Sequence, residues 1–210
     1  MCFDIKTSIT AFVIGTISVI YGIFYYKDAS YTGLMLALEF ALLMQIFDAI
    51  AWSNLKCGTS SNKFATRGAF VANMMQPIIV FMALILVSKT SKKLKMTAVV
   101  IISIYVAWVL STLGDVCSES CISPKPKCDH LNYYWWDKIK YGGMIYTLVL
   151  ISMFLLLIRP FKFSIIVCVT TLILLFLSGY IYKCGTSTVW CFFVAFSPLL
   201  FLVIYKHVRD

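Results

Sequence analysis

Polar side chains interrupt a long apolar stretch of the chain that runs from Tyr31 to Ser53. The stretch can cross a bilayer as a helix, because about 20 residues at 1.5 Å per residue span the hydrocarbon core. It contains Glu39, Gln45 and Asp48. A carboxyl group at the bilayer centre costs about 2.5–3.5 kcal/mol on insertion scales, so acids at this depth commonly mark ion or substrate pathways. These residues therefore predict a site for a small solute or a proton.

Further candidate residues are expected at a similar depth. Gln45, Asp48 and Trp52 share one helix face, because their spacing is i, i+3, i+7. Asn73 and Gln76 repeat the i, i+3 spacing in the following apolar run. The alternative is a polar cluster that only holds helices together, through interhelical bonds of about 0.6–2 kcal/mol each. The residues predicted to bind or wall a ligand are Gln45, Asp48, Trp52, Asn73, Gln76 and Trp190.

Glu39 is expected to act separately. It lies nine residues before Asp48, which is about 13.5 Å along a helix axis and half a turn around it. The two carboxyl groups therefore cannot form one paired site. Two titratable groups at two depths suit a proton relay, and Glu39 is the predicted relay residue. The alternative is a glutamate that the bilayer tolerates and that has no role.

The composition indicates an integral membrane protein. Of 210 residues, 61% are hydrophobic and 13% are charged, and the mean hydropathy is +0.90. A soluble domain has about 45–50% apolar and 25% charged residues. The net charge of +9 comes from short loops between apolar runs, which favours anionic lipid headgroups over nucleic acid as the partner. The lipid bilayer and a small solute or proton are the expected partners, and no cofactor is expected.

Hydropathy predicts seven membrane-spanning helices in a single all-α domain, residues 1–210. The expected spans are roughly 8–26, 31–53, 67–88, 96–113, 141–158, 161–182 and 187–205. The fifth and sixth meet at Arg159–Pro160, where the proline ends one helix and starts the next. The alternative is that 141–182 forms one kinked element. A cysteine-rich loop, 114–140, ends in Tyr133–Trp136, the expected aromatic belt at the level of the lipid headgroups.

Charge and cysteine placement predict an extracellular or lumenal N-terminus and a cytoplasmic C-terminus. Each face of the membrane has nine Lys or Arg residues, but one face concentrates them in short loops with few acids. The positive-inside rule places that face in the cytoplasm. Six of the eight cysteines lie on the other face, which indicates disulfides in an oxidising compartment. They are Cys2, Cys57, Cys117, Cys121, Cys128 and Cys184, and six cysteines allow fifteen pairings.

Most enzyme templates do not fit the sequence. The chain has two histidines, His130 and His207, so neither haem ligation within the membrane nor a His-rich metal site is expected. One alternative function is a thiol-dependent membrane enzyme that uses Cys2 and Cys191, because removal of Met1 would make Cys2 an N-terminal cysteine whose thiolate is a nucleophile or a redox partner of Cys191. Another is a receptor-like or structural protein, for example of a viral envelope. A zinc site, as the alternative to disulfides, would use Cys117, Cys121, Cys128 and His130.

The pentapeptide Lys-Cys-Gly-Thr-Ser occurs twice, at Lys56–Ser60 and at Lys183–Ser187. Superposing the copies maps the second predicted span onto the sixth and leaves the fourth as a linker. This is the parallel 3+1+3 repeat of small SWEET-type transporters. Pro77 and Pro198 lie in the third span of each half. The alternative is two similar turns whose cysteines pair with each other.

Several short motifs, taken in order, resemble a family of small multi-span membrane proteins whose activity is not established. The family opens Met-Cys-Phe-Ser, and this chain has Asp4 where the family has serine. In the family, the second span has Gln followed by an acid and then Trp, and the third span has a proline. The family's last span has Ser-Val-Trp-Cys-Phe-Phe. The matching positions here are Met1–Phe3, Gln45, Asp48, Trp52, Pro77 and Thr188–Phe193. The resemblance supports the position of the site and implies no chemistry.

Overall fold

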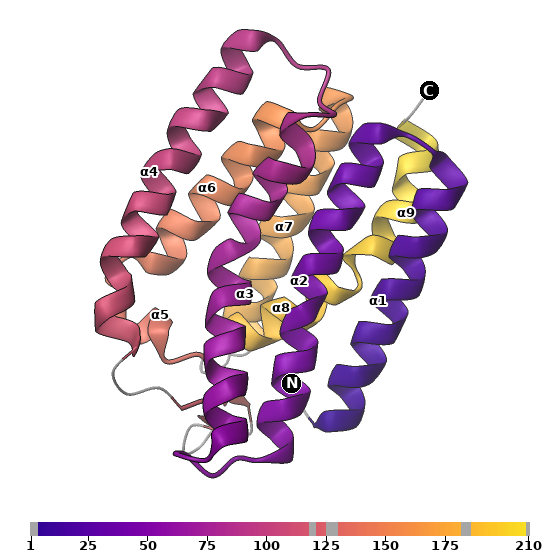
Figure 1. The fold of residues 1–210 in the computed structure, drawn as a ribbon. Helices are drawn as coiled ribbons and strands as arrows, with labels where there is room; N and C mark the ends of the chain where they lie inside the picture. The colour runs from indigo at the N-terminus through magenta and orange to yellow at the C-terminus, as the bar shows by residue number, and fades with distance from the viewer. Residues whose placement is uncertain (1–3, 118–120, 125–129, 182–185, 209–210) are drawn as a thin grey trace.

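The computed structural model describes residues 4–117, 121–124, 130–181 and 186–208 (Figure 1). Nine helices and one antiparallel hairpin make up this part of the chain. The helices are α1 (Ile5–Tyr26), α2 (Ala29–Ser53), α3 (Ser60–Ile85), α4 (Lys92–Cys117), α5 (Trp135–Lys138), α6 (Gly142–Leu157), α7 (Phe161–Ile181), α8 (Thr186–Ala195) and α9 (Ser197–Val208). The strands are β1 (Ser123–Pro124) and β2 (Leu131–Asn132). The predicted all-α class is confirmed.

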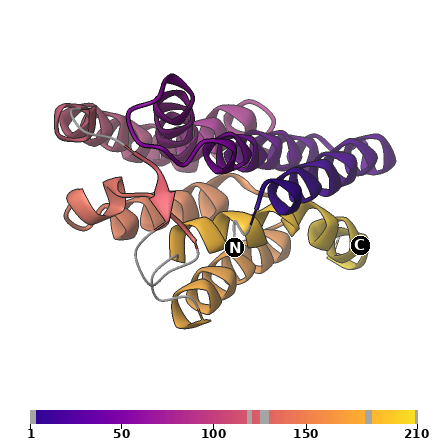
Figure 2. The same cartoon turned by 90° about the horizontal axis from the view of Figure 1, so that it is seen from below.

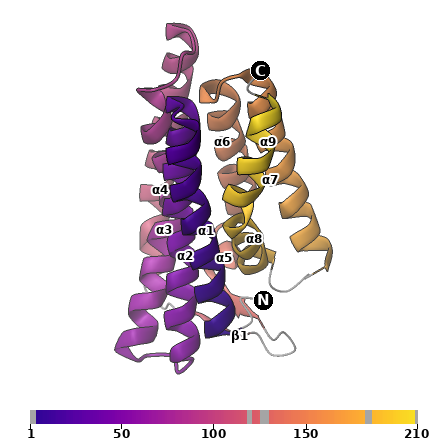
Figure 3. The ribbon, with the colours of Figure 1, turned by 90° about the vertical axis from the view of Figure 1, so that its right-hand side faces the viewer.

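The long helices pack in two layers. Figures 2 and 3 show α1, α2, α3 and α4 side by side in one layer, with α6, α7 and the α8–α9 pair in the other. α2 packs against α1 and α3 within its layer and against α8 across it, while α6 packs against α3, α4 and α7. The polar face of α2 is therefore enclosed between the layers.

Five helices are long and apolar enough to cross a membrane, namely α1, α2, α3, α4 and α7. α8 and α9 meet at 49° and make a sixth candidate if they form one broken span. α6 is apolar but has 16 residues, a rise of about 24 Å against a hydrocarbon core of about 30 Å. Several membrane-length helices are thus confirmed and indicate membrane insertion, whereas seven spans and a repeat are not confirmed.

The two halves of the expected repeat differ where the structure describes them. Pro77 lies inside the continuous helix α3, whereas Pro198 follows the bend between α8 and α9. The first pentapeptide forms the turn before α3, and its Thr59 caps that helix by accepting from the Asn62 N–H at 3.4 Å. The second begins outside the described residues. The repeat stays a prediction.

A glycine brings α1, α2 and α8 close together. A Cβ atom on Gly15 would lie 2.6 Å from Leu42 Cδ2 in α2 and 2.7 Å from the backbone oxygen of Ala195 in α8. Small residues at such crossings let helix backbones approach, which is how helices associate within lipid. The contact fixes α2, and with it Gln45 and Asp48, relative to α8.

We name described residues 121–124 and 130–141 the hairpin segment, which folds over the lower end of the bundle in Figure 1. Its strands pair Ser123 with Asn132. Thr188 Oγ1 in α8 donates to the Leu131 carbonyl oxygen at 3.0 Å. The predicted loop 114–140 therefore begins as the last turn of α4 and ends in the hairpin and α5.

The hairpin segment is also fastened to the start of α3. Cys121 forms a disulfide with Cys57, which precedes α3. The Ile122 N–H donates to Thr66 Oγ1 at 2.9 Å, and the Ile122 carbonyl oxygen accepts from Asn62 Nδ2 at 2.9 Å. One covalent and two polar links thus hold this segment on the bundle.

The disulfide confirms part of the cysteine prediction. Because Cys121 is bonded to Cys57, it is not available to ligate zinc, so the four-residue zinc alternative is wrong. Across the described ranges, no group of three or more His, Cys, Asp or Glu side chains could hold a metal ion. The remaining expected disulfide cysteines lie outside the described residues or have an undescribed side chain, and they are Cys2, Cys117, Cys128 and Cys184.

At the opposite end of the bundle, Arg159 joins three elements. Its Nη1 donates to the Ile158 carbonyl oxygen at 2.6 Å beyond the end of α6. Its Nη2 donates to Thr90 Oγ1 at 2.7 Å in the α3–α4 connection, and its backbone N–H donates to Ser30 Oγ at 3.3 Å in α2. The turn between α6 and α7 is therefore held against the first layer.

Candidate functional site

Three polar side chains of α2 and α3 are hydrogen-bonded by aromatic residues from the hairpin segment and α6. Tyr133 Oη donates to Asp48 Oδ1 at 2.7 Å across a sequence separation of 85 residues. The other pairs are Trp135 Nε1 donating to Asn73 Oδ1 at 3.4 Å and Tyr146 Oη donating to Gln76 Oε1. All three acceptor side chains are buried. The structure thus places Asp48, Asn73 and Gln76 against one set of aromatic donors.

Tyr133 and Trp135 correct the prediction of an aromatic belt. They are 1% and 0% exposed, and their rings stack at a centroid distance of 4.7 Å. Belt residues keep their rings at the membrane–water boundary, but these two point into the bundle, where their polar atoms reach Asp48 and Asn73. Sequence reasoning missed them and Tyr146 as site residues. The available signal was the aromatic run itself, since buried Tyr and Trp need a hydrogen-bond partner.

Cys191 in α8 connects the two ends of this cluster. Its thiol lies near the Asp48, Tyr133 and Tyr146 side chains. Cys191 is a buried free thiol. Cys2, the expected partner in thiol chemistry, lies outside the described residues. α8 therefore closes the cluster from the second layer.

Gln45 and Trp190 carry buried polar atoms that have no hydrogen-bond partner among the described residues. Gln45 is 0% exposed, and neither its Oε1 nor its Nε2 is bonded within that part of the chain. The Nε1 atoms of Trp190 and of the half-buried Trp52 are in the same condition. A buried polar group without a partner costs about 1–3 kcal/mol, so a binding site is one reason to retain it.

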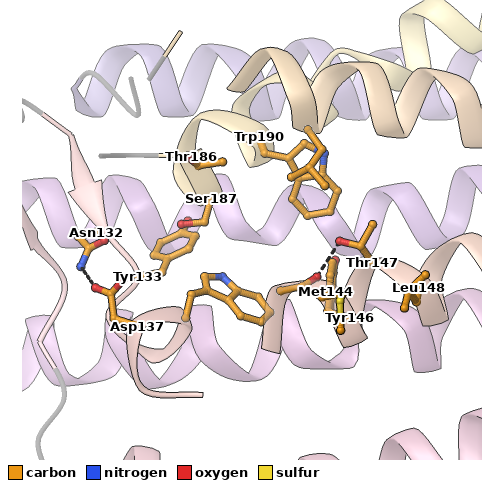
Figure 4. A pocket seen from close by; sticks show the side chains of 13 residues that line it. Asn132, Tyr133, Asp137, Met144, Tyr146, Thr147, Leu148, Thr186, Ser187 and Trp190 are labelled. Atoms are coloured by element: carbon orange, nitrogen blue, oxygen red, sulfur yellow. Dashed lines mark hydrogen bonds between the residues drawn. The ribbon is translucent and has the colours of Figure 1, made fainter. Parts of the chain in front are cut away.

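A cavity of about 510 Å³ opens beside this cluster (Figure 4). Four aromatic residues wall it, namely Tyr133, Trp136, Tyr146 and Trp190. Polar groups line it from Asn132, Asp137, Thr147, Thr186 and Ser187. Asp48 and Gln76 lie one hydrogen bond behind this wall. Of the residues predicted from sequence, Trp190 lines the cavity directly.

A second void of about 30 Å³ lies deeper in the bundle. Gln76 and Trp190 line it, together with mostly apolar residues of α2, α6, α7 and α9. It is large enough for one water molecule, which needs about 10–15 Å³. The rings of Tyr146 and Trp190 meet edge to face at 5.7 Å. Trp190 thus lies between the open cavity and the central void.

Glu39 lies apart from these residues, between α2 and α1. Thr16 Oγ1 donates to Glu39 Oε1 at 2.9 Å. Glu39 Oε2 is buried and has no hydrogen-bond partner within the described ranges. Glu39 and Asp48 therefore face different neighbours, α1 and the hairpin segment, in agreement with their half-turn separation.

No family model, curated protein or solved structure matches the chain. The family resemblance inferred from the motifs therefore stays a prediction.

Proposed function

We propose that the protein is a multi-pass membrane protein that binds and moves a small solute or a proton through the site around Asp48. The observation that carries the proposal is Gln45, which is fully buried, lacks partners for both amide atoms among the described residues and lies one helical turn from Asp48. A cluster that served only to hold helices together would satisfy this amide. An open cavity in front of the cluster gives a solute a way in.

Seven spans follow if α6 and the α8–α9 pair each cross the bilayer. α6 lies alongside α3, α4 and α7, and its 16 residues cover most of the hydrocarbon thickness. The hairpin segment and the Arg159 turn then lie at the two membrane boundaries. Because α1 and the α8–α9 pair begin at the same end of the bundle (Figure 1), the two termini lie on opposite sides of the membrane.

The disulfide supports an extracellular or lumenal N-terminus. Cys57 and Cys121 are bonded at the end of the bundle where α1 begins (Figure 1). Disulfides persist in oxidising compartments and are rare in the cytosol. The lysine-rich stretch Lys89–Lys95 and Arg159 lie at the other end, as the positive-inside rule requires of a cytoplasmic face.

The aromatic wall is the gate in this proposal. The Tyr146–Trp190 contact lies between the cavity and the central void, because Trp190 lines both spaces, and Tyr133 lines the cavity while it donates to Asp48. A solute passes when these rings rotate, and Asp48 then exchanges the Tyr133 hydroxyl for a donor on the solute or takes up a proton. Charge interactions are strong there because water is largely excluded. Such collective rearrangements take place on the microsecond to millisecond scale.

The test is flux through purified protein in proteoliposomes. Light scattering would follow osmotic entry of glucose, glycine and choline chloride, and entrapped pyranine would follow protons. Asp48→Asn keeps an acceptor for Tyr133 but loses the charge, so we expect the wild-type flux to fall to background without loss of thermal stability. Ser103→Ala is the matched control, because Ser103 is exposed on α4 and donates within its own helix.

Two outcomes would contradict the proposal. If vesicles with wild-type protein show the same flux as empty vesicles for every solute and for protons, the protein does not transport them. Wild-type flux in Asp48→Asn, combined with a large loss of stability in Asp48→Leu, would identify the cluster as a structural link between helices.

A further inference from the structure

The lysine-rich start of α4 carries a groove on the outer surface of the bundle. The groove encloses about 550 Å³, and its described lining residues all belong to α4, namely Lys92, Lys93, Met96, Thr97, Val100 and Ile101. We propose that this groove binds a phospholipid with an anionic headgroup, whose phosphate contacts the two lysines while an acyl chain lies along the apolar residues. The inference goes beyond the proposed transport function and does not depend on it.

The groove changes from charged to apolar along the helix. Its lining residues form two rows with i, i+4, i+8 spacing, which places them on one side of α4. Each row begins with a lysine and ends in Val100 or Ile101, eight residues and about 12 Å further along the axis. This length fits within one leaflet, which is about half of the 30 Å hydrocarbon core. A phospholipid has the same order of parts, a charged head followed by an apolar chain.

The charged end of the groove favours an anion. Lys92 and Lys93 are exposed, and the sequence from Lys89 to Ile101 contains four lysines and no acid. Thr97 Oγ1 donates to the Lys93 carbonyl oxygen at 3.1 Å, so its hydroxyl proton is used within the helix and the lysines supply the donors for a ligand. Ammonium groups form strong hydrogen bonds to phosphate oxygens, and four or more basic residues beside a membrane helix attract anionic lipid.

Arg159 adds positive charge at the same end of the bundle. Its Nη2 donates to Thr90 Oγ1 at 2.7 Å, two residues before Lys92. Its Nη1 donates to the carbonyl oxygens of Leu155 at 3.2 Å and Ile158 at 2.6 Å. These three acceptors are neutral, so the contacts do not cancel the charge of Arg159. An anionic headgroup at Lys92 therefore meets a positive potential from both the start of α4 and the turn between α6 and α7.

The apolar part of the groove faces away from the bundle. α4 lies at the edge of its layer (Figure 1) and packs against α3, α5 and α6. Only 17% of the residues in its most apolar stretch are buried, against 56% for α2. Met96 and Val100 are 57% and 52% exposed. Acyl chains cover such a face in a membrane, and the lysines at its end select the headgroup by charge complementarity.

Binding is measured by native mass spectrometry on the full chain in a maltoside detergent, which carries no charge. Dioleoylphosphatidylglycerol is the main ligand, and dioleoylphosphatidylcholine has the same chains on a headgroup without net charge. Glycerol 3-phosphate supplies the phosphate without chains. We expect phosphatidylglycerol to bind at least tenfold more tightly than either of the other two compounds.

A pair of double variants tests the position of the headgroup. Lys92→Gln combined with Lys93→Gln should weaken phosphatidylglycerol about fivefold for each lysine, and so about 25-fold together. Both side chains are exposed, so the melting temperature should match that of wild type. The control combines Lys27→Gln with Lys162→Gln. These lysines are exposed after α1 and in the first turn of α7, outside the described lining, and their loss removes the same charge from the same end of the bundle.

A second pair of variants tests the position of the acyl chain. Met96→Ser removes apolar surface from the groove and should weaken phosphatidylglycerol about threefold, close to the loss of one buried methylene group. Met82→Ser is the matched control, because Met82 is 58% exposed on α3, against 57% for Met96, and lies outside the described lining. It should bind phosphatidylglycerol like wild type.

Three outcomes would overturn the inference. Equal affinity for phosphatidylglycerol and phosphatidylcholine would show that the headgroup charge is not recognised. An equal loss in the two lysine double variants would show that the lipid responds only to the overall charge of this end of the bundle. Glycerol 3-phosphate that binds as tightly as phosphatidylglycerol would identify a site for free phosphate compounds and not for a lipid.

Discussion

Tyr133 donates a 2.7 Å hydrogen bond to Asp48, which lies 85 residues earlier in the chain. Asp48 is fully buried and Tyr133 is 1% exposed, so water does not compete for the contact. A buried acceptor that loses its donor costs about 1–3 kcal/mol. This bond therefore couples the hairpin segment to the membrane-buried part of α2.

The first prediction concerns the coupling of these two side chains. Tyr133→Phe removes the donor and should lower the melting temperature, because it leaves a buried carboxyl group with one partner fewer. Asp48→Leu removes the acceptor, and the double variant should lose less than the sum of the single losses, with a coupling energy of about 1–2 kcal/mol. Tyr141→Phe is the control, because Tyr141 is 62% exposed. If the stability lost by the double variant equals the sum of the two single losses, the contact contributes nothing to the stability of the native fold.

The helices could be predicted from the sequence because their apolar runs are long and bounded by polar turns. The positions of Gln45, Asp48, Asn73 and Gln76 were also predictable, since each lies at i, i+3 spacing in an apolar run. The aromatic residues that donate hydrogen bonds to Asp48, Asn73 and Gln76 could not be predicted. Tyr133 carries the features of an interfacial aromatic residue, and only the fold of the hairpin segment, set by contacts distant in sequence, turns it inward. The pairing of Cys57 with Cys121 depends on the same long-range fold.

The second prediction concerns topology. Cys57 and Cys121 are bonded at the end of the bundle where α1 begins. In sealed cells, a membrane-impermeant maleimide should label them from outside only after mild reduction, because the disulfide blocks both thiols. Cys57→Ser should make Cys121 reactive without reductant. Labelling of either position solely from the cytoplasmic side would reverse the proposed orientation.

The third prediction concerns the crossing of α1 with α2 and α8. Gly15→Ala should destabilise the protein by about 1–3 kcal/mol, the usual cost of overpacking, because the new methyl group would meet Leu42 and the backbone oxygen of Ala195. Gly143→Ala is the matched control, since a Cβ atom there has nothing within 4 Å. Thermal melting in detergent should separate the two variants. Equal melting temperatures would show that α1 is not packed this closely.

The fourth prediction concerns pH and the start of α1. Asp4 accepts from the Thr7 N–H at 2.7 Å, and this bond is the main reason that the Asp4 pKa lies below its ordinary value of 3.8. A carboxyl group with a lowered pKa stabilises the fold above its unfolded pKa, and the effect is lost as the pH falls through the folded pKa. Amide exchange in the first turn should therefore rise on acidification relative to Asp4→Asn at the same pH. If wild type and Asp4→Asn show the same amide exchange at every pH, titration of Asp4 does not affect the start of α1.

The fifth prediction concerns Glu39, which we propose as a proton relay separate from Asp48. Glu39→Gln keeps an oxygen that accepts from Thr16 Oγ1 but cannot titrate, so stability should hold while the pH dependence of flux flattens. Thr16→Val has the opposite design: it removes the donor and leaves the acid. That variant should lose about 1 kcal/mol of stability and keep a pH-dependent flux.

Pyranine-loaded vesicles measure both variants across a pH series, with melting curves run on the same preparations. Flux reports titration and melting reports packing. Glu39→Gln should alter the pH dependence of flux and spare stability, whereas Thr16→Val should lower stability and spare the pH dependence. If Glu39→Gln follows wild type at every pH while Thr16→Val is destabilised, Glu39 serves only to hold α1 against α2. The route would then depend on Asp48 alone, and Glu39 would be a polar residue that the Thr16 hydroxyl allows the bilayer to tolerate.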